Sequence, residues 1–405
     1  MTSLSGSISL PAGKHILYVY PMWHTVSFTL IAKKHVEHMR KAFGIAVQEL
    51  DELAFTSFVP SLRYTAFVHP WMFIYHRFIN AKLSALSESL RDRLDKYIEW
   101  WRTHFEQLIA VDVCDSDRLS DYAVSLLNHS DKIIVPSSFC VDVYRGSGVK
   151  KPVHRVPHGV DPEWYTTPNV WETAPVKVVN PALLELFLYK FRKGKKFLLF
   201  WLWHSGERKG WPEVREVYSR LARERRDVVL VLKTAVPYTR EFQEVMHLGA
   251  LQVYGWLSDY EKMALYDLAD VTLNFSRGGG FELNCLESLA RGVPCIASNW
   301  GSWTDYAPEF LRVRTGERVQ PLPNNAIHVG YGYKVDVEDA LNKIHSVLES
   351  YEELRARVEE WRSRLANVYR WDRVAQKLLE LALGVDTQIN VLSKPISLGE
   401  PHVHR

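Results

Sequence analysis

The feature that most constrains the fold is the regular alternation of short apolar runs with amphipathic stretches along the chain. In the first part of the sequence these runs have the length and residue content of buried strands. They lie at residues 15–20, 64–70, 108–114, 132–137 and 153–159. Helical patterns separate them, and strands that alternate with helices pair in parallel through crossover connections. The sequence therefore predicts a parallel α/β sheet.

The alternation stops near residues 162–195, which are rich in Pro, Thr and Asn, and then resumes. The second series of strand-like runs lies at 196–203, 228–233, 251–255, 271–276 and 294–298. We predict two doubly wound Rossmann-like domains, and the predicted organisation is domains at 1–170 and 196–370, a linker at 171–195, a helix at 371–385 and a polar tail at 386–405. Ligands of such sheets bind at the carboxyl ends of the strands, so we expect a site in the cleft between the domains.

Composition excludes several classes of protein. The formal net charge of the 405-residue chain is only +3 and no basic tail is present, which gives no electrostatic case for nucleic acid. The four cysteines lack Cys-x-x-Cys spacing, which argues against structural zinc and for a reducing compartment. No secretory leader is visible at the N-terminus, and no run reaches the roughly 18 apolar residues of a membrane span. We therefore expect a cytoplasmic protein.

One amphipathic stretch leaves a peripheral membrane contact open. In residues 90–110 an apolar stripe recurs at helical spacing, formed by Leu94, Tyr97, Ile98, Trp101, Phe105 and Leu108. Packing of a helix against a sheet is the commoner origin of such a stripe, and a membrane surface is the alternative.

The stretch "SRGGGFELNCLESLARGVP" at residues 276–294 permits two interpretations. Glycines after a strand let backbone amides approach an anion, and the N-terminus of the following helix favours negative charge. In the structural alternative, Asn284 caps the helix, Glu287 is its reciprocal capping partner, and Gly292 ends the helix. The local sequence alone does not decide between them.

The same stretch resembles the donor-site segment of retaining GT-B glycosyltransferases, in particular family four. Those enzymes carry a pattern similar to Ser-x-x-Glu-Gly-Phe-Gly-Leu-x-x-x-Glu-Ala-x-Ala-x-Gly-x-Pro. This chain matches the pattern at Ser276, Gly280, Phe281, Leu283, Glu287, Ala290, Gly292 and Pro294. Further segments agree in order and spacing, namely "GERKGWP" at 206–212, "VYGWLSDYEKMALYDLADVTLNFS" before the glycines, residues 135–165 and residues 369–382. The resemblance covers roughly residues 108–382.

The resemblance implies a GT-B fold and a role for several residues. The first domain would be the acceptor side, the second would bind the nucleotide sugar, and the helix at 371–385 would return to the first domain. Glu287 would bind the ribose hydroxyls, and Lys209 with Arg208 would neutralise the departing diphosphate. Trp256 and Leu257 would lie against the base, although core packing explains them equally well. The donor-binding loop would comprise Gly278, Gly279, Gly280, Phe281 and Glu282.

The chain departs from the family pattern at several positions. The first donor-loop glutamate of the family, which contacts the transferred sugar, falls on Gly279, while Glu282 stands where the family has glycine. An arginine common after the first strand of the second domain falls near Trp203, and "PMWHTVSF" replaces a glycine pair near the N-terminus. We therefore ask whether Glu282 substitutes for the missing carboxylate.

A second motif, "DVCDSDRLSD" at 112–121, contains the D-x-D pattern of GT-A enzymes, in which paired carboxylates bind Mn or Mg. It also resembles a cleft loop of some family-four members. We accordingly expect Asp115 to face the cleft near donor or acceptor and Asp117 to cap the next helix. His35 and His38 have helical spacing without a third ligand, so we expect a solvated face there.

The sequence therefore predicts a retaining, metal-independent, hexosyltransferase-like enzyme that needs no cofactor besides a nucleoside diphosphate sugar. The acceptor is left open among glycan, lipid, protein and small molecule, as is the oligomeric state. Two alternatives remain open: a non-catalytic nucleotide-sugar binding protein, which Gly279 motivates, and a nucleotide-sugar epimerase of GT-B fold.

Overall fold

The computed structural model describes residues 13–85, 93–202, 205–235 and 239–384. The predicted tail at 386–405 and position 203 therefore lie outside the described residues. The chain forms two compact units: unit 1 takes in residues 1–113, 119–158 and 371–405, and unit 2 takes in 114–118 and 159–370. Among the described residues, no helix combines the length and the apolar character needed to span a bilayer.

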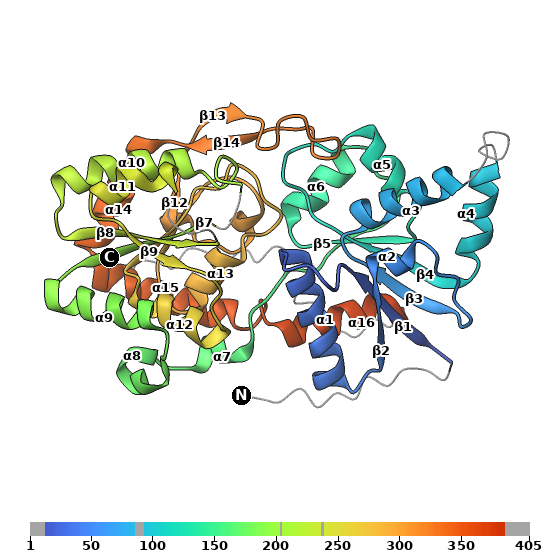
Figure 1. The fold of residues 1–405 in the computed structure, drawn as a ribbon, viewed down its shortest axis with the longest axis horizontal. Helices are drawn as coiled ribbons and strands as arrows, with labels where there is room; N and C mark the ends of the chain where they lie inside the picture. Colours follow the sequence, from blue (N-terminus) through green and yellow to red (C-terminus); the bar gives the residue numbers. More distant parts are fainter. Residues whose placement is uncertain (1–12, 86–92, 203–204, 236–238, 385–405) are drawn as a thin grey trace, which may run out of the picture. The chain divides into compact units, whose positions relative to one another are not determined.

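Unit 1 is built on a six-stranded sheet in the order β2-β1-β3-β4-β5-β6 (Figure 1). All neighbouring strands pair in parallel, as the alternation of strands and helices predicts. The strands are β1 (His15–Tyr20), β2 (Val47–Asp51), β3 (Tyr64–Val68), β4 (Phe105–Val111), β5 (Lys132–Val135) and β6 (Val153–Arg155). The sequence did not predict β2, whose residues "VQELD" carry little apolar signal.

Helices pack on this sheet and include the last helix of the described chain. They are α1 (Ser27–Phe43), α2 (Glu52–Phe55), α3 (Trp71–Ala85), α4 (Leu94–Arg102), α5 (Asp121–Leu127), α6 (Ser138–Gly146) and α16 (Trp371–Leu383). Figure 1 shows α16, in red, beside α1, in dark blue. The Lys132 ammonium donates a hydrogen bond to the Leu381 carbonyl at 2.8 Å, which ties the C-terminal end of α16 to β5.

Two predictions in unit 1 are wrong. The helical stripe of residues 90–110 is interrupted, because α4 ends at Arg102 and both Phe105 and Leu108 belong to β4. The inner part of the stripe, Ile98 and Trp101, is buried, so packing against the sheet accounts for it.

His35 is not on a solvated face either, because the inner face of α1 buries it. The exposed fractions of His35 and His38 are 2% and 8%. The Tyr18 hydroxyl lies 2.7 Å from His35 Nδ1, and the His35 ring centroid lies 6.1 Å from that of His69. Burial lowers the pKa of His35, so the imidazole is a neutral core residue.

Unit 2 has a second six-stranded parallel sheet, in the order β12-β11-β10-β7-β8-β9. Its strands are β7 (Lys196–Leu202), β8 (Val228–Thr234), β9 (Leu251–Tyr254), β10 (Val271–Asn274), β11 (Cys295–Ser298) and β12 (Arg312–Val313). An antiparallel pair, β13 (Thr315–Val319) and β14 (Gly332–Val335), follows. The predicted pair of doubly wound α/β sheets is confirmed, and the neighbours β7 and β10 mark the point where the strand order reverses.

The helices of unit 2 cover both faces of its sheet (Figure 1). They are α7 (Pro162–Thr166), α8 (Val170–Thr173), α9 (Pro181–Lys193), α10 (Trp211–Glu224), α11 (Gln243–His247), α12 (Asp259–Leu268), α13 (Leu283–Ala290), α14 (Val337–Glu349) and α15 (Tyr351–Leu365). Residues 171–195 are therefore not a linker: most of them lie in α8 and α9, within unit 2.

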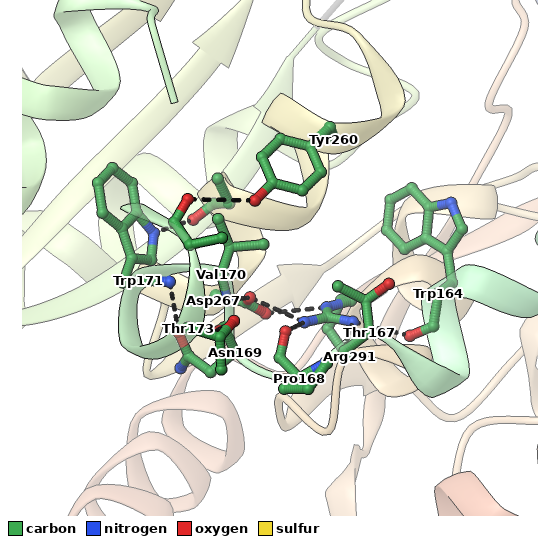
Figure 2. A network of polar contacts seen from close by, with 12 residues as sticks. Trp164, Thr167, Pro168, Asn169, Val170, Trp171, Thr173, Tyr260, Asp267 and Arg291 are labelled. Atoms are coloured by element: carbon green, nitrogen blue, oxygen red, sulfur yellow. Dashed lines mark hydrogen bonds and ion pairs between the residues drawn. The ribbon is translucent and has the colours of Figure 1, made fainter. Parts of the chain in front are cut away.

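A buried arginine ties residues 164–168, which precede that segment, to unit 2 (Figure 2). The Arg291 guanidinium donates to the carbonyls of Trp164, Thr167 and Pro168 at 2.7–3.0 Å. It also forms two hydrogen bonds, of 2.9 and 2.8 Å, with the Asp267 carboxylate. The segment at 171–195 is itself joined to α12 by hydrogen bonds from Trp171 Nε1 to the Ala264 carbonyl and from the Lys190 ammonium to the Leu268 carbonyl, both at 2.7 Å.

Candidate functional site

The candidate site lies at the carboxyl edge of the unit 2 sheet, where β7 and β10 are neighbours. The loop after β7 carries Arg208 and Lys209, and the loop after β10 runs through Ser276 and the three glycines to α13. Chain reversal between adjacent strands opens a crevice between the loops that follow them. The strand order thus brings together two segments about 70 residues apart in sequence.

Glu282 is the acidic centre of this site. Its carboxylate accepts hydrogen bonds from the Lys209 ammonium at 2.7 and 2.6 Å and from the Ser276 hydroxyl at 3.1 Å. Only 2% of its side chain is exposed. Its backbone is left-handed, with φ 65°, a conformation that disfavours any residue with a Cβ atom. The local structure maintains this strain while it holds the carboxylate on Lys209.

Gly279 has no room for a side chain because of Glu282. A Cβ atom at Gly279 would lie 2.2 Å from Glu282 Oε1. The Glu282 carboxylate therefore occupies the space that a side chain at position 279 would enter. The family resemblance raised the question of whether Glu282 substitutes for the carboxylate missing at position 279. The structure places the Glu282 carboxylate against the backbone of Gly279.

Arg208 links the glycine loop to Asp115. It donates a hydrogen bond to the Gly278 carbonyl at 2.8 Å and lies 3.6 Å from the Asp115 carboxylate. Burial would raise the pKa of Asp115, but Arg208, together with His328 and Lys209, outweighs burial and lowers that pKa below its usual value. The backbone N–H of Gly280 donates to the same carboxylate. Asp115 is therefore an anion within this cluster.

The surroundings of Lys209 shift the pKa of its ammonium group. Burial lowers the pKa of its ammonium below the usual value for lysine, and the attraction of Glu282 opposes this shift. The site thus combines two cations and two carboxylates in a poorly solvated space, where charge interactions are stronger than in water.

Glu287 forms a second acid–base group on α13. Its carboxylate accepts hydrogen bonds from the Lys262 ammonium at 3.0 Å and from the Tyr266 hydroxyl at 2.8 Å, both on α12. The N-capping part of the structural alternative is wrong: α13 begins at Leu283, Glu282 precedes it, and no side chain caps it. Its other part is confirmed, because Gly292 follows the end of α13 with φ 72° and its N–H donates to the Leu289 carbonyl at 3.1 Å. The left-handed turn at Glu282 starts the helix before Asn284, which leaves Glu287 in the second turn and directed toward α12.

The predicted base-binding residues differ in exposure. Trp256, in the loop after β9, is 56% exposed, whereas Leu257 is buried. Phe281 is also buried, its ring 4.9 Å from that of Tyr306. Only Trp256 among these presents a large aromatic surface to solvent.

Lys233 was missed by the sequence analysis. It lies near the end of β8, 1% exposed, and its ammonium donates to the carbonyls of Thr234 at 3.2 Å and Gly255. Burial lowers its pKa to about 8. A lysine at the carboxyl end of the otherwise apolar run "VVLVLK" is the signal that could have identified it.

The two acids of the D-x-D motif have separate partners. Asp115 faces Arg208, whereas Asp117 accepts from Arg318 at 2.9 Å and from the Tyr331 backbone N–H at 2.6 Å. Asp117 does not cap α5, because the Ser120 hydroxyl does so. Within the described ranges, no group of three or more His, Cys, Asp or Glu side chains has the arrangement of a metal site.

Comparisons with known proteins agree with this arrangement. Residues 198–320 match the family described as Glycosyl transferases group 1. Uncharacterized protein 356 of Sulfolobus islandicus rod-shaped virus 1 is 30% identical over 376 residues, which cover 91% of this chain and 98% of that protein. Putative glycosyltransferase 45 of Sulfolobus islandicus filamentous virus is 25% identical over 253 residues, 60% of this chain and 64% of that protein.

A solved structure gives the same result for the fold. The structure of HepE from Anabaena in complex with UDP has a TM-score of 0.63 and 12% identity, over 92% of this chain and 100% of that one. The two parallel sheets therefore form a GT-B fold, and the glycosyltransferase group 1 domain includes both loops of the candidate site.

Proposed function

The chain belongs to the same protein family as Uncharacterized protein 356 of the rod-shaped virus, and we propose that it is a family-four-like, retaining GT-B glycosyltransferase. It transfers a sugar, in our proposal a hexose, from a nucleoside diphosphate sugar to an acceptor without a metal ion. The observation that carries this proposal is the convergence of Arg208, Lys209, Glu282 and Asp115 where β7 and β10 end. The match of residues 198–320 to glycosyl transferases supports it.

Glu287 is the proposed ribose ligand. A carboxylate has about four lone-pair positions, and Lys262 and Tyr266 use two of them. Both partners fix the carboxylate while acceptor capacity remains for neighbouring hydroxyls. Trp256 is the proposed stacking surface for the base, and its exposure supports that role.

Arg208 and Lys209 are the proposed diphosphate ligands. Negative charge grows on the leaving diphosphate during transfer, and cations already fixed in a poorly solvated site stabilise it without reorganisation. Gly278, Gly279 and Gly280 add backbone groups at the same place. Since Lys209 donates to Glu282, a bound diphosphate would share the ammonium with that carboxylate.

Glu282 and Asp115 are the proposed contacts of the transferred sugar. Both are anionic acceptors next to the two cations, and hydroxyl groups donate well to carboxylates. Glu282 then performs, from another position, the task that the family's glutamate has at position 279. This assignment answers the motive that Gly279 gave for a non-catalytic binder; the binder and the epimerase are outcomes of the screen below.

Metal independence is proposed because both D-x-D carboxylates are engaged by arginines, Asp115 by Arg208 and Asp117 by Arg318. Retention of anomeric configuration is proposed from the family resemblance alone. Analysis of the product anomer by NMR tests it.

A screen of nucleotide sugars tests the proposed function. A ligand at 100 times its dissociation constant stabilises the folded chain by about 2.7 kcal/mol, so UDP-, GDP- and ADP-sugars are compared by thermal shift. Donor consumption is then measured with and without glycan, lipid, peptide and small-molecule acceptors. Consumption that requires an acceptor supports transfer, interconversion without acceptor supports an epimerase, and binding without consumption supports a non-catalytic binder.

A further inference from the structure

The β13–β14 pair carries a long connecting segment, residues 320–331, that packs against the candidate site. The Asp117 backbone N–H donates to the Tyr331 carbonyl at 2.9 Å, and the Gly330 N–H donates to the Ser116 hydroxyl at 3.2 Å. A Cβ atom at Gly278 would lie 2.8 Å from the Pro321 side chain. The segment is therefore fixed against both the Asp115 stretch and the glycine loop.

His328 is the side chain that this segment brings to Asp115. The Asn325 side chain accepts hydrogen bonds from the backbone N–H groups of Ile327 and His328, at 2.9 and 2.8 Å, and so forms the turn that presents the imidazole. The Asp115 N–H then donates to His328 Nδ1 at 3.3 Å. Because Nδ1 accepts, the neutral ring carries its proton on Nε2.

Burial of His328 favours that neutral form. Burial lowers the pKa of His328, Asp115 opposes the shift and Arg208 adds to it, so the pKa lies below its usual value. The ring thus carries one N–H donor, on Nε2, and is held by its Nδ1 against the backbone of Asp115, whose carboxylate is an acceptor. A neutral donor beside an anionic acceptor suits a hydroxyl group, which both accepts and donates.

We propose that His328 is a specificity-determining residue whose Nε2–H donates a hydrogen bond to a hydroxyl group of the transferred sugar, while Asp115 accepts from the same sugar. The inference rests on the proposed function, because it needs a nucleotide sugar in the site. It adds to that function a contact supplied by the β13–β14 segment, outside the matched residues 198–320.

Three substitutions of His328 distinguish a direct contact with the sugar from a role in which the ring only supports Asp115. Asparagine places an amide oxygen near the position of Nδ1 and keeps the acceptor for the Asp115 N–H, but it lacks the distal donor. Glutamine places an amide nitrogen near the position of Nε2. Alanine removes both, and Val329→Ala, a half-exposed neighbour on the same segment, is the control.

Binding and turnover are measured on the full chain. We expect His328→Ala and His328→Asn to lower nucleotide-sugar affinity and kcat/KM by about tenfold, the effect of one lost hydrogen bond. His328→Gln should stay within about threefold of the wild type on the same scale. Affinity for the nucleoside diphosphate alone should not change in any variant, whereas the melting temperature should fall in His328→Ala, which leaves the Asp115 N–H without its acceptor.

Two results overturn the inference. Wild-type behaviour of His328→Asn with loss in His328→Gln means that the ring only supports Asp115. Wild-type behaviour of all variants means that His328 does not touch the sugar. If the wild type binds or consumes no nucleotide sugar, the proposed function fails and the inference fails with it. If the wild type is active, these results remove only the inference.

Discussion

Two glutamate–lysine pairs lie close together in unit 2 but are built differently. Glu287 projects from α13, in regular helical backbone, toward Lys262. Glu282 precedes the same helix with φ 65°, and its carboxylate meets Lys209. The first pair fits the local structure, whereas the second requires a backbone conformation that costs about 1–2 kcal/mol for a residue other than glycine.

The difference indicates which pair the fold needs for stability and which it holds for the chemistry. A helical carboxylate with two fixed partners stabilises the contact between α12 and α13. A strained carboxylate persists only where surrounding contacts impose it, and such residues concentrate at functional sites. We infer that Glu287 has both a structural and a ligand-binding role, and that Glu282 is held mainly for its role in the site.

The largest effect on activity is expected at the pair formed by Glu282 and Lys209, in which Glu282 has the strained backbone. Lys209→Met removes a cation proposed to stabilise the leaving diphosphate, and we expect kcat to fall by about 100- to 1000-fold. Steady-state kinetics with the donor from the screen measures this, and circular dichroism checks that the variant is folded. A loss of less than tenfold would show that Lys209 is not the main diphosphate ligand.

The helical pair should show its effect in binding. Glu287→Gln replaces a charge-assisted hydrogen bond to the ribose with a neutral one, and we expect the free energy of nucleotide binding to become less favourable by about 1 to 1.5 kcal/mol. Calorimetric titration with UDP and GDP measures the change. Asn284→Ala is the matched control on the same helix and should bind as the wild type does, because Asn284 does not cap α13. Intact affinity in Glu287→Gln, with lower stability, would make the role of Glu287 structural only.

Glycine substitution at both positions compares the backbones directly. Glu282→Gly places glycine where the backbone is left-handed, which removes strain, whereas Glu287→Gly places glycine inside a helix, which destabilises it. The free energy of unfolding should therefore be about 2 kcal/mol higher for Glu282→Gly than for Glu287→Gly. Each variant also loses one lysine partner, which makes them a matched pair. Urea denaturation measures the difference, and equal destabilisation would contradict the strain at Glu282.

The smallest effect is expected from chelation. Turnover should be unchanged in excess EDTA, because Arg208 and Arg318 engage Asp115 and Asp117 separately. Loss of activity with EDTA and its recovery with Mn would instead assign both carboxylates to a metal.

Much of the fold could be predicted from the sequence because buried parallel strands are short apolar runs. The strands from "HILYVY" to "PCIAS" were found within a few residues of their bounds. The strands β2, β12, β13 and β14 were missed, since a two-residue strand and partly exposed strands such as "TGERV" show no apolar run. The helix at 90–110 was predicted too long, because an aromatic-rich strand follows α4 without a break in hydrophobicity.

The site was predictable only in part, because a sequence pattern reports neither backbone conformation nor contacts between distant parts of the chain. The resemblance identified the loop that carries Lys209 and the segment that carries Glu287, but it does not report backbone conformation. Neither the left-handed turn at Glu282 nor its carboxylate against Gly279 can be deduced from residue types. Long-range contacts also escaped prediction: His328 is 213 residues from Asp115 in sequence, and Lys233 is recognised only once its burial is known.

The central claim is that Glu282 supplies the carboxylate that the family has at position 279. A double-mutant cycle of Gly279→Glu and Glu282→Gly tests it through kcat/KM with one donor. Gly279→Glu alone should impair transfer, since a Cβ atom there would lie 2.2 Å from Glu282 Oε1, and Glu282→Gly alone should lose the sugar contact. The account predicts that the double variant recovers most of the wild-type activity. A double variant no more active than the weaker single variant, or a Gly279→Glu variant equal to the wild type, would contradict it.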